Sequence, residues 1–369
     1  MLLVIVLGNA HVFLYGHKIG VRRYPIFEEV PDQVLALFQM TFVDGRGYPM
    51  FAALFGYGLV QLARRQARLG LEPRAVRRIL RRRGCGLVLL GFAHALFLFS
   101  GDIIGAYGML AVLLTGVVVG ASDRALLLIA GIWMIPAAFY GALQGIPVPE
   151  HAPPLESSIS TSAPLKAAGF RVEEWGKQSP VQVSFSLISP MLIGAWAGRR
   201  RLLDEPERYQ RCLRGVAVLG VGAAVAGGLP MALMASEVWT EPTPVANIVA
   251  GVLHAVTGYA GGVGYAALAG LIAIRLSVRQ GPVVRAMKAC GQRSMTCYLG
   301  QSVLLVAVLP AYGGGLGDHL GVAEAAVLAV LIWCVVVAMA DIMRRLSVRG
   351  PAEVLLRRVT YGRASAAKH

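Results

Sequence analysis

The chain has 369 residues, of which 56% are hydrophobic and only 15% are Asp, Glu, Lys or Arg. Soluble domains carry nearer a quarter of charged residues, so this composition excludes an ordinary soluble protein and indicates a polytopic membrane protein. A net charge of +15 could suggest a nucleic-acid ligand. Most Lys and Arg residues, however, alternate with apolar runs, in 64–83, at Arg124, and in 199–214, 275–293 and 344–369. This is the positive-inside pattern, so we expect contact with membrane lipids and no nucleic-acid partner.

The first apolar run, residues 1–16, is short for a membrane span. A helix of this length extends about 24 Å, whereas the hydrocarbon core of a bilayer is about 30 Å thick. We therefore expect a half-length helix or a first span that is truncated because its true start lies upstream. Residues 33–43 are apolar but also short, and we expect a helix at the outer membrane interface.

Two longer apolar runs, 44–63 and 84–101, flank a basic loop with nine arginines and one acid, Glu72. A short basic loop stays in the cytoplasm. The opposite ends of both spans then face outward, where they carry Asp44, Arg46 and Asp102, with His94 a few turns deeper.

The rest of the chain continues the alternation of apolar spans and polar loops. We expect further spans at 103–120, 124–144, 181–198, 215–236, 245–274, 294–312 and 322–343. The interval 145–180 is rich in Pro, Ser and Thr and too polar to span, so we expect an outer loop. It would be a flexible flap or would form a short amphipathic helix around Arg171–Trp175. The predicted fold is a single all-α membrane bundle over 1–369, with about ten transmembrane helices and both termini cytoplasmic.

No phosphate-binding loop, HExxH motif or GxSxG elbow is present, and the five cysteines form no CxxC pair. We therefore predict no metal site.

Ionisable residues within spans are costly and serve as the candidate functional groups. His94 is a candidate general base and Asp102 a candidate partner that orients it. The alternative is that His94 only bonds a neighbouring helix and that Asp102 only caps the following helix.

Other polar residues are candidates for substrate binding. Asp44 and Arg46 would line the outer end of their span, or would form a simple interfacial ion pair. His254 and Gln301 lie within later spans, where polar groups need partners on other helices. His11, near the outer end of the first span, is a further candidate base.

Several segments together resemble the YeiB family of polytopic bacterial membrane proteins, whose domain has no assigned function. These segments are FVDGRGYPMFAALFGYG, GFAHALFLFSGDIIGAYGML, MLIGAWAGRR, GQRSMTCYLGQS and RGPAEVLLRRVTYG. The resemblance implies a family-defining region at about 210–365 and a multi-pass protein of the bacterial cell membrane. The family is distantly similar to transmembrane acyltransferases, some of which use a histidine or asparagine near the end of the first span. The matching position here is Asn9, close to His11.

The resemblance implies acyl transfer to an envelope or extracytoplasmic hydroxyl or amine, with acyl-coenzyme A as the candidate donor. His94 or His11 would take the proton of the acceptor, and Arg46 or Asn9 would stabilise the oxyanion. Two alternatives stay open. The chain could transport or flip a small or amphiphilic molecule, or it could be a scaffold for envelope proteins.

Overall fold

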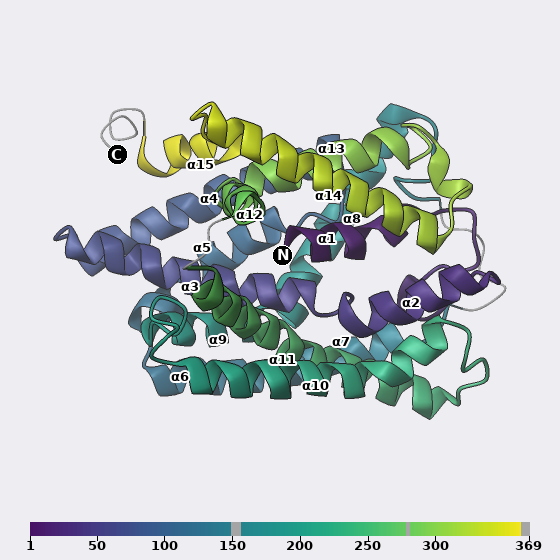
Figure 1. The fold of residues 1–369 in the computed structure, drawn as a ribbon, viewed down its shortest axis with the longest axis horizontal. Helices are drawn as coiled ribbons and strands as arrows, with labels where there is room; N and C mark the ends of the chain where they lie inside the picture. The colour runs from purple at the N-terminus through teal and green to yellow at the C-terminus, as the bar shows by residue number, and fades with distance from the viewer. Residues whose placement is uncertain (149–155, 278–280, 363–369) are drawn as a thin grey trace.

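A computed structural model describes residues 1–148, 156–277 and 281–362, and the fold over these residues is all-α, as predicted (Figure 1). The α-helices are α1 (Leu2–Ala10), α2 (Val30–Phe42), α3 (Gly47–Arg68), α4 (Pro73–Phe97), α5 (Ile104–Gly120), α6 (Asp123–Ile132), α7 (Met134–Gly145), α8 (Pro164–Val181), α9 (Ile188–Arg199), α10 (Gln210–Ala235), α11 (Pro244–Ser277), α12 (Pro282–Gln292), α13 (Ser294–Val308), α14 (Val322–Arg345) and α15 (Pro351–Tyr361). Short helical turns are η1 (His11–Phe13), η2 (Val21–Arg23) and η4 (Leu316–Asp318), and η3 (Gln182–Leu187) is a π-helix.

Five stretches of the described chain are helical, long and apolar enough to cross a membrane: Asp123–Gly145, Pro164–Arg199, Gln210–Ala235, Pro244–Leu276 and Val322–Arg345. Three shorter apolar helices accompany them: Leu2–Phe13, Ile104–Gly120 and Ser294–Val308. Lipid can solvate such helices because their backbone groups are bonded internally. The chain is thus a multi-pass membrane protein, while the number of ten spans and their orientation stay predictions.

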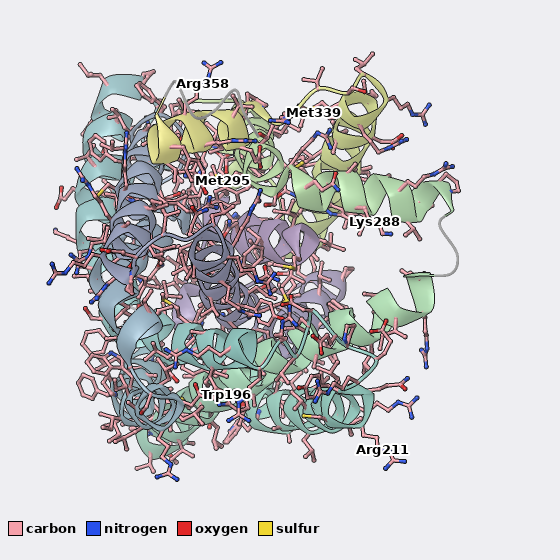
Figure 2. All side chains as sticks on the ribbon, turned by 90° about the vertical axis from the view of Figure 1, so that its left-hand side faces the viewer. Trp196, Arg211, Lys288, Met295, Met339 and Arg358 are labelled. Atoms are coloured by element: carbon pink, nitrogen blue, oxygen red, sulfur yellow. The ribbon has the colours of Figure 1, made fainter. Side chains whose placement is uncertain are left out.

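The arginine-rich segment 64–83 is not an extended loop, contrary to expectation. Helix α3 continues to Arg68 and α4 begins at Pro73, so only the four residues between them form the turn. Arginine has a high helix propensity, which lets both helices continue as charged hairpin arms. The hairpin projects at the left of Figure 1. Figure 2 looks onto that end and shows Arg211, Lys288 and Arg358 around the rim of the view.

The helix predicted over 33–43 is present as α2 with slightly different bounds, and it packs into the bundle, while its place at the outer interface stays a prediction. It contacts α10 and α14, and its Ala36 and Met40 are buried in the core. Figure 1 shows α2 and α3 end to end along the bundle. They are separated by a break that contains Gly45, whose φ of 71° is in the left-handed region that glycine adopts without steric cost. The two helices together therefore resemble one long helix that is broken in its middle.

The polar interval 145–180 forms a helix over much of its length. Its residues 149–155 lie outside the described chain, but α8 begins at Pro164 and continues through η3 into α9. The helix is attached to its neighbours: Arg171 Nε donates to Leu96 O over 3.1 Å, and its guanidinium lies 4.7 Å from the centre of the Tyr312 ring. The predicted helix around Arg171–Trp175 is thus present with wider bounds, and α8 packs against α4 and α5.

Candidate functional sites

His94 and Asp102 face each other where α4 and α5 meet. His94 Nδ1 lies 3.0 Å from Asp102 Oδ1, and both side chains are fully buried. The contact is short, but its alignment is outside hydrogen-bond geometry. The carboxylate also accepts hydrogen bonds from the backbone N–H groups of Ile104 (3.1 Å) and Gly105 (2.5 Å). Asp102 thus caps the N-terminus of α5 and contacts His94 at the same time, so the two roles considered from the sequence coexist.

Close packing of α4 on α5 brings these two residues together. Gly91 lies at the crossing, where a Cβ atom would collide with the Gly105 backbone and with the Asp102 carboxylate. A second close approach lies further along the same helix pair, between Gly84 and Gly108. In a membrane bundle such small residues let backbones approach, and here they also fix the position of Asp102.

The other ring nitrogen of His94 contacts Ser302, a residue that the sequence analysis missed. His94 Nε2 lies 2.8 Å from Ser302 Oγ, on α13. Gln301, the predicted candidate next to Ser302, instead places its Nε2 3.5 Å from Leu2 O. The only sequence signal for Ser302 is a small polar residue in an apolar span, and such residues commonly serve helix packing. The structure thus aligns Asp102, His94 and Ser302 from three different elements.

Tyr298 completes this first cluster. Its ring centre lies 5.1 Å from that of His94. Its buried hydroxyl lies near the Ile103 backbone but makes no hydrogen bond of good geometry with any described residue. A buried hydroxyl without a partner is costly in an apolar interior, so it is a donor available to a ligand.

A second cluster forms at the break between α2 and α3. Asp44 Oδ2 lies 2.5 Å from Arg22 Nε and 3.3 Å from His254 Nε2. Arg22, on η2, was not predicted. The expected ion pair of Asp44 with Arg46 is wrong in detail, because Arg46 Nη1 donates to the backbone oxygen of Asp44 over 2.6 Å.

Arg46 is fully buried and is held by α10 and α11. Its Nη2 donates to Ala224 O over 2.6 Å, and its Nη1 lies 2.9 Å from His254 Nε2. Glycines make the space for it, because a Cβ atom at Gly228 would collide with Nη2. The Nε atom of Arg46 has no hydrogen-bond partner among the described residues.

The charges of the second cluster do not balance. The cluster holds two guanidinium groups, of Arg22 and Arg46, but one carboxylate, that of Asp44, which pairs with Arg22. Positive charge in a low-dielectric interior attracts an anion, and α3 directs its N-terminus, the positive end of its dipole, from Gly47 towards the same break.

His11 and Asn9 do not join the first cluster. The His11 ring stacks on that of Tyr24 at 4.3 Å, close enough to Asp44 to interact with it electrostatically. The Tyr24 hydroxyl in turn donates to Gln39 Oε1. Asn9 is half-buried near the end of α1. The described residues thus form two clusters, with His94 and Asp102 in the first and Arg46 in the second.

No group of three or more His, Cys, Asp and Glu residues is arranged to hold a metal ion in the part of the chain that the structure describes. The histidines and carboxylates of both clusters instead lie against each other, against arginine or against serine.

The apolar helices and the polar groups buried among them define the class of this chain: a multi-pass membrane protein with two internal polar clusters. Residues 197–363 match the family model described as "Protein of unknown function (DUF418)", so the chain carries the domain of the YeiB-type family, and the resemblance is confirmed. Comparisons with curated proteins and with solved structures found no match. The matched segment supplies Ser302 to the first cluster and His254 to the second, while His94 and Asp44 precede it.

Proposed function

We propose that this protein is a transmembrane acyltransferase with His94 as its general base. The observation that carries the proposal is the proximity of Asp102, His94 and Ser302, with 3.0 Å and 2.8 Å between the successive polar atoms. A carboxylate, an imidazole and a hydroxyl in this order form the usual machinery of acyl transfer on unrelated folds.

Each residue has a defined task in this proposal. His94 Nε2 takes the proton of the attacking hydroxyl or amine and returns it to the leaving group. Asp102 favours the tautomer of His94 that carries its proton on Nδ1, and stabilises the imidazolium as it forms. Two backbone N–H groups hold Asp102 in place. Burial strengthens these electrostatic effects because water is excluded.

The donor that we propose is a thioester such as acyl-coenzyme A, and the acceptor is an envelope or extracytoplasmic hydroxyl or amine. Arg46, which the sequence suggested as the oxyanion donor, is engaged with Ala224, Asp44 and His254 in the second cluster. The Tyr298 hydroxyl is the better candidate for that task, since it is buried beside His94 and has no hydrogen-bond partner among the described residues.

The test is transfer of radiolabelled acyl groups from acyl-coenzyme A to membrane extract by the purified protein. We expect His94→Ala to lower the rate by roughly 10²–10⁴-fold, the usual contribution of a general base. His319→Ala is the control, because that histidine is 74% exposed in the loop between α13 and α14. An inactive wild-type protein, or a His94→Ala variant with the wild-type rate, would overturn the proposal.

A second candidate function, transport of a small molecule with an anionic group, is favoured by the second cluster. Secondary transporters commonly bind substrates where a membrane helix is broken, with helix ends and ionisable residues at the break. The break between α2 and α3 has this form, with Asp44, Arg46 and His254 around it.

Uptake into proteoliposomes tests this candidate with a panel of radiolabelled small carboxylates. We expect accumulation by the wild-type protein and its loss in His254→Ala and Asp44→Asn. His94→Ala is the control, because the first cluster has no task in this scheme. Uptake that is absent, or that depends on His94 alone, contradicts transport through the second cluster.

A further inference from the structure

We infer that Ser302 is the residue that carries the acyl group, so that the reaction proceeds through an acyl-serine intermediate. This inference rests on the proposed function and adds to it a covalent step and its nucleophile. The observation behind it is the position of Ser302 Oγ, 2.8 Å from the Nε2 atom of a histidine whose Nδ1 faces a carboxylate. A serine becomes a nucleophile when a base is within hydrogen-bond reach and a third group orients that base.

The alternative is that Ser302 only bonds its own helix. Its Oγ lies 3.3 Å from Tyr298 O, one turn earlier, which is the usual back-bond of a serine within a helix. The contact with His94 is the shorter one, and the imidazole is the only partner of Ser302 in the described chain that can remove its proton. The carbonyl contact then holds Oγ in the rotamer that faces His94.

The first half-reaction consumes the thioester. The Ser302 hydroxyl gives its proton to His94 Nε2 while Oγ forms a bond to the acyl carbonyl carbon. The bond between that carbon and sulfur breaks, and the thiolate leaves as a thiol with the proton from His94. The products are acyl-Ser302, the free thiol and neutral His94, so atoms and charge balance without another reactant.

The second half-reaction delivers the acyl group. The acceptor hydroxyl or amine gives a proton to His94 Nε2 and attacks the ester carbon. The bond from that carbon to Oγ breaks, and Oγ takes the proton back from His94. Ser302 is restored and the acceptor leaves as an ester or amide.

Tyr298 is placed to serve both half-reactions. It precedes Ser302 by four residues, so the two side chains lie on the same face of α13. Its hydroxyl can donate to the oxyanion that forms next to Oγ in each step. Because Ser302 is only 4% exposed, the acyl carbonyl reaches it when neighbouring side chains move apart.

The experiment is to incubate the purified protein with acyl-coenzyme A in the absence of acceptor and to analyse its peptides by mass spectrometry. We expect the acyl mass on the peptide that contains Ser302, no such mass in Ser302→Ala, and slower labelling in His94→Ala. Ser302→Cys should retain the label as a thioester that neutral hydroxylamine removes. The matched control is Ser189→Ala, because Ser189 is also buried but lies on α9 and donates its hydrogen bond to Met134 Sδ.

The outcomes separate this inference from the proposed function. If Ser302→Ala transfers acyl groups at the wild-type rate while His94→Ala does not, the acyl-serine is wrong and direct transfer by His94 stands. If the label is found on another residue, Ser302 is again excluded. If the wild-type protein transfers no acyl group, both proposals fail together. Thermal unfolding of each variant in detergent distinguishes loss of chemistry from loss of fold.

Discussion

His94 and Ser302 are 208 residues apart in sequence, yet Nε2 of the first lies 2.8 Å from Oγ of the second. The contact joins α4 to α13, which belongs to the segment that carries the family match. The segment 197–363 therefore does not contain the first cluster by itself. A functional test of this family segment requires the N-terminal helices as well.

Replacing Asp102 by Asn should separate its structural role from its catalytic role. The amide oxygen can still accept the hydrogen bond from Gly105 N–H, although the one from Ile104 N–H is lost, so the fold should persist with a weaker cap on α5. The amide cannot stabilise an imidazolium, and we expect the transfer rate to fall by roughly 10²–10⁴-fold. The measurement is acyl transfer alongside the unfolding midpoint in detergent. A variant with the wild-type transfer rate would show that Asp102 is only a cap.

Replacing Gly91 by Ala should displace Asp102 without altering any polar group. The added methyl would collide with the Asp102 carboxylate and with the backbone of Gly105. We expect a loss of about 1–3 kcal/mol in unfolding free energy, typical of overpacking, together with reduced transfer. Gly116→Ala, in the same helix pair, is the control because no atom lies within 4 Å of its added Cβ. Equal stability of the two variants would argue against close packing at Gly91.

Replacing Asp44 by Asn should destabilise the break between α2 and α3. The change removes the carboxylate that pairs with Arg22, and with it the negative charge near the buried Arg46, whose bond to the backbone oxygen of residue 44 remains. We expect a loss of about 2–4 kcal/mol, somewhat below the full effect for a buried pair because the Asp44 side chain is 21% exposed.

The control for this variant is Glu173→Gln, since Glu173 forms an exposed pair with Lys177. Its removal should cost only about 0.2–1 kcal/mol. Both values come from chemical unfolding in the same detergent. If added small carboxylates raise the unfolding free energy of the wild-type protein more than that of an Arg46→Gln variant, the cluster binds an anion. If Asp44→Asn is as stable as Glu173→Gln, the Asp44 carboxylate does not stabilise the guanidinium groups of the second cluster.

The orientation of the bundle is open to a direct labelling experiment. The positive-inside rule places the tip of the α3–α4 hairpin in the cytoplasm. In a variant without native cysteines, we expect Arg78→Cys to react with an impermeant maleimide only after cells are permeabilised. Glu241→Cys, exposed between α10 and α11, should react in intact cells. The reverse result would invert the assigned orientation.

The sequence was sufficient for the class and the broad architecture of this protein. Apolar runs of spanning length and the placement of arginine reflect the solvation of each residue by lipid or water, which depends on local composition. The same local information missed the helices in 64–83, where arginine favours helix, and it gave only the centre of α8, whose contacts with α4 and α5 accompany a longer helix.

For the candidate sites, the sequence identified residues but not their partners. His94, Asp102, Asp44, Arg46 and His254 were predicted because ionisable groups at membrane depth are costly and need a reason to be there. Arg22 and Ser302 could not be found this way, because an arginine in a loop and a serine in a helix are common and do not by themselves indicate a functional site.

Only the tertiary structure decided which of these groups meet. Asp102 could face His94 only because Gly91 lets two backbones approach, and Ser302 completed the cluster from the far end of the chain. Similarly, the sequence placed a boundary between residues 43 and 44, but only the turn at Gly45 and the packing of α11 brought Asp44 and Arg46 to His254. Whether a segment lies in lipid or in water depends on its local composition. Which distant residues touch depends on how whole helices pack.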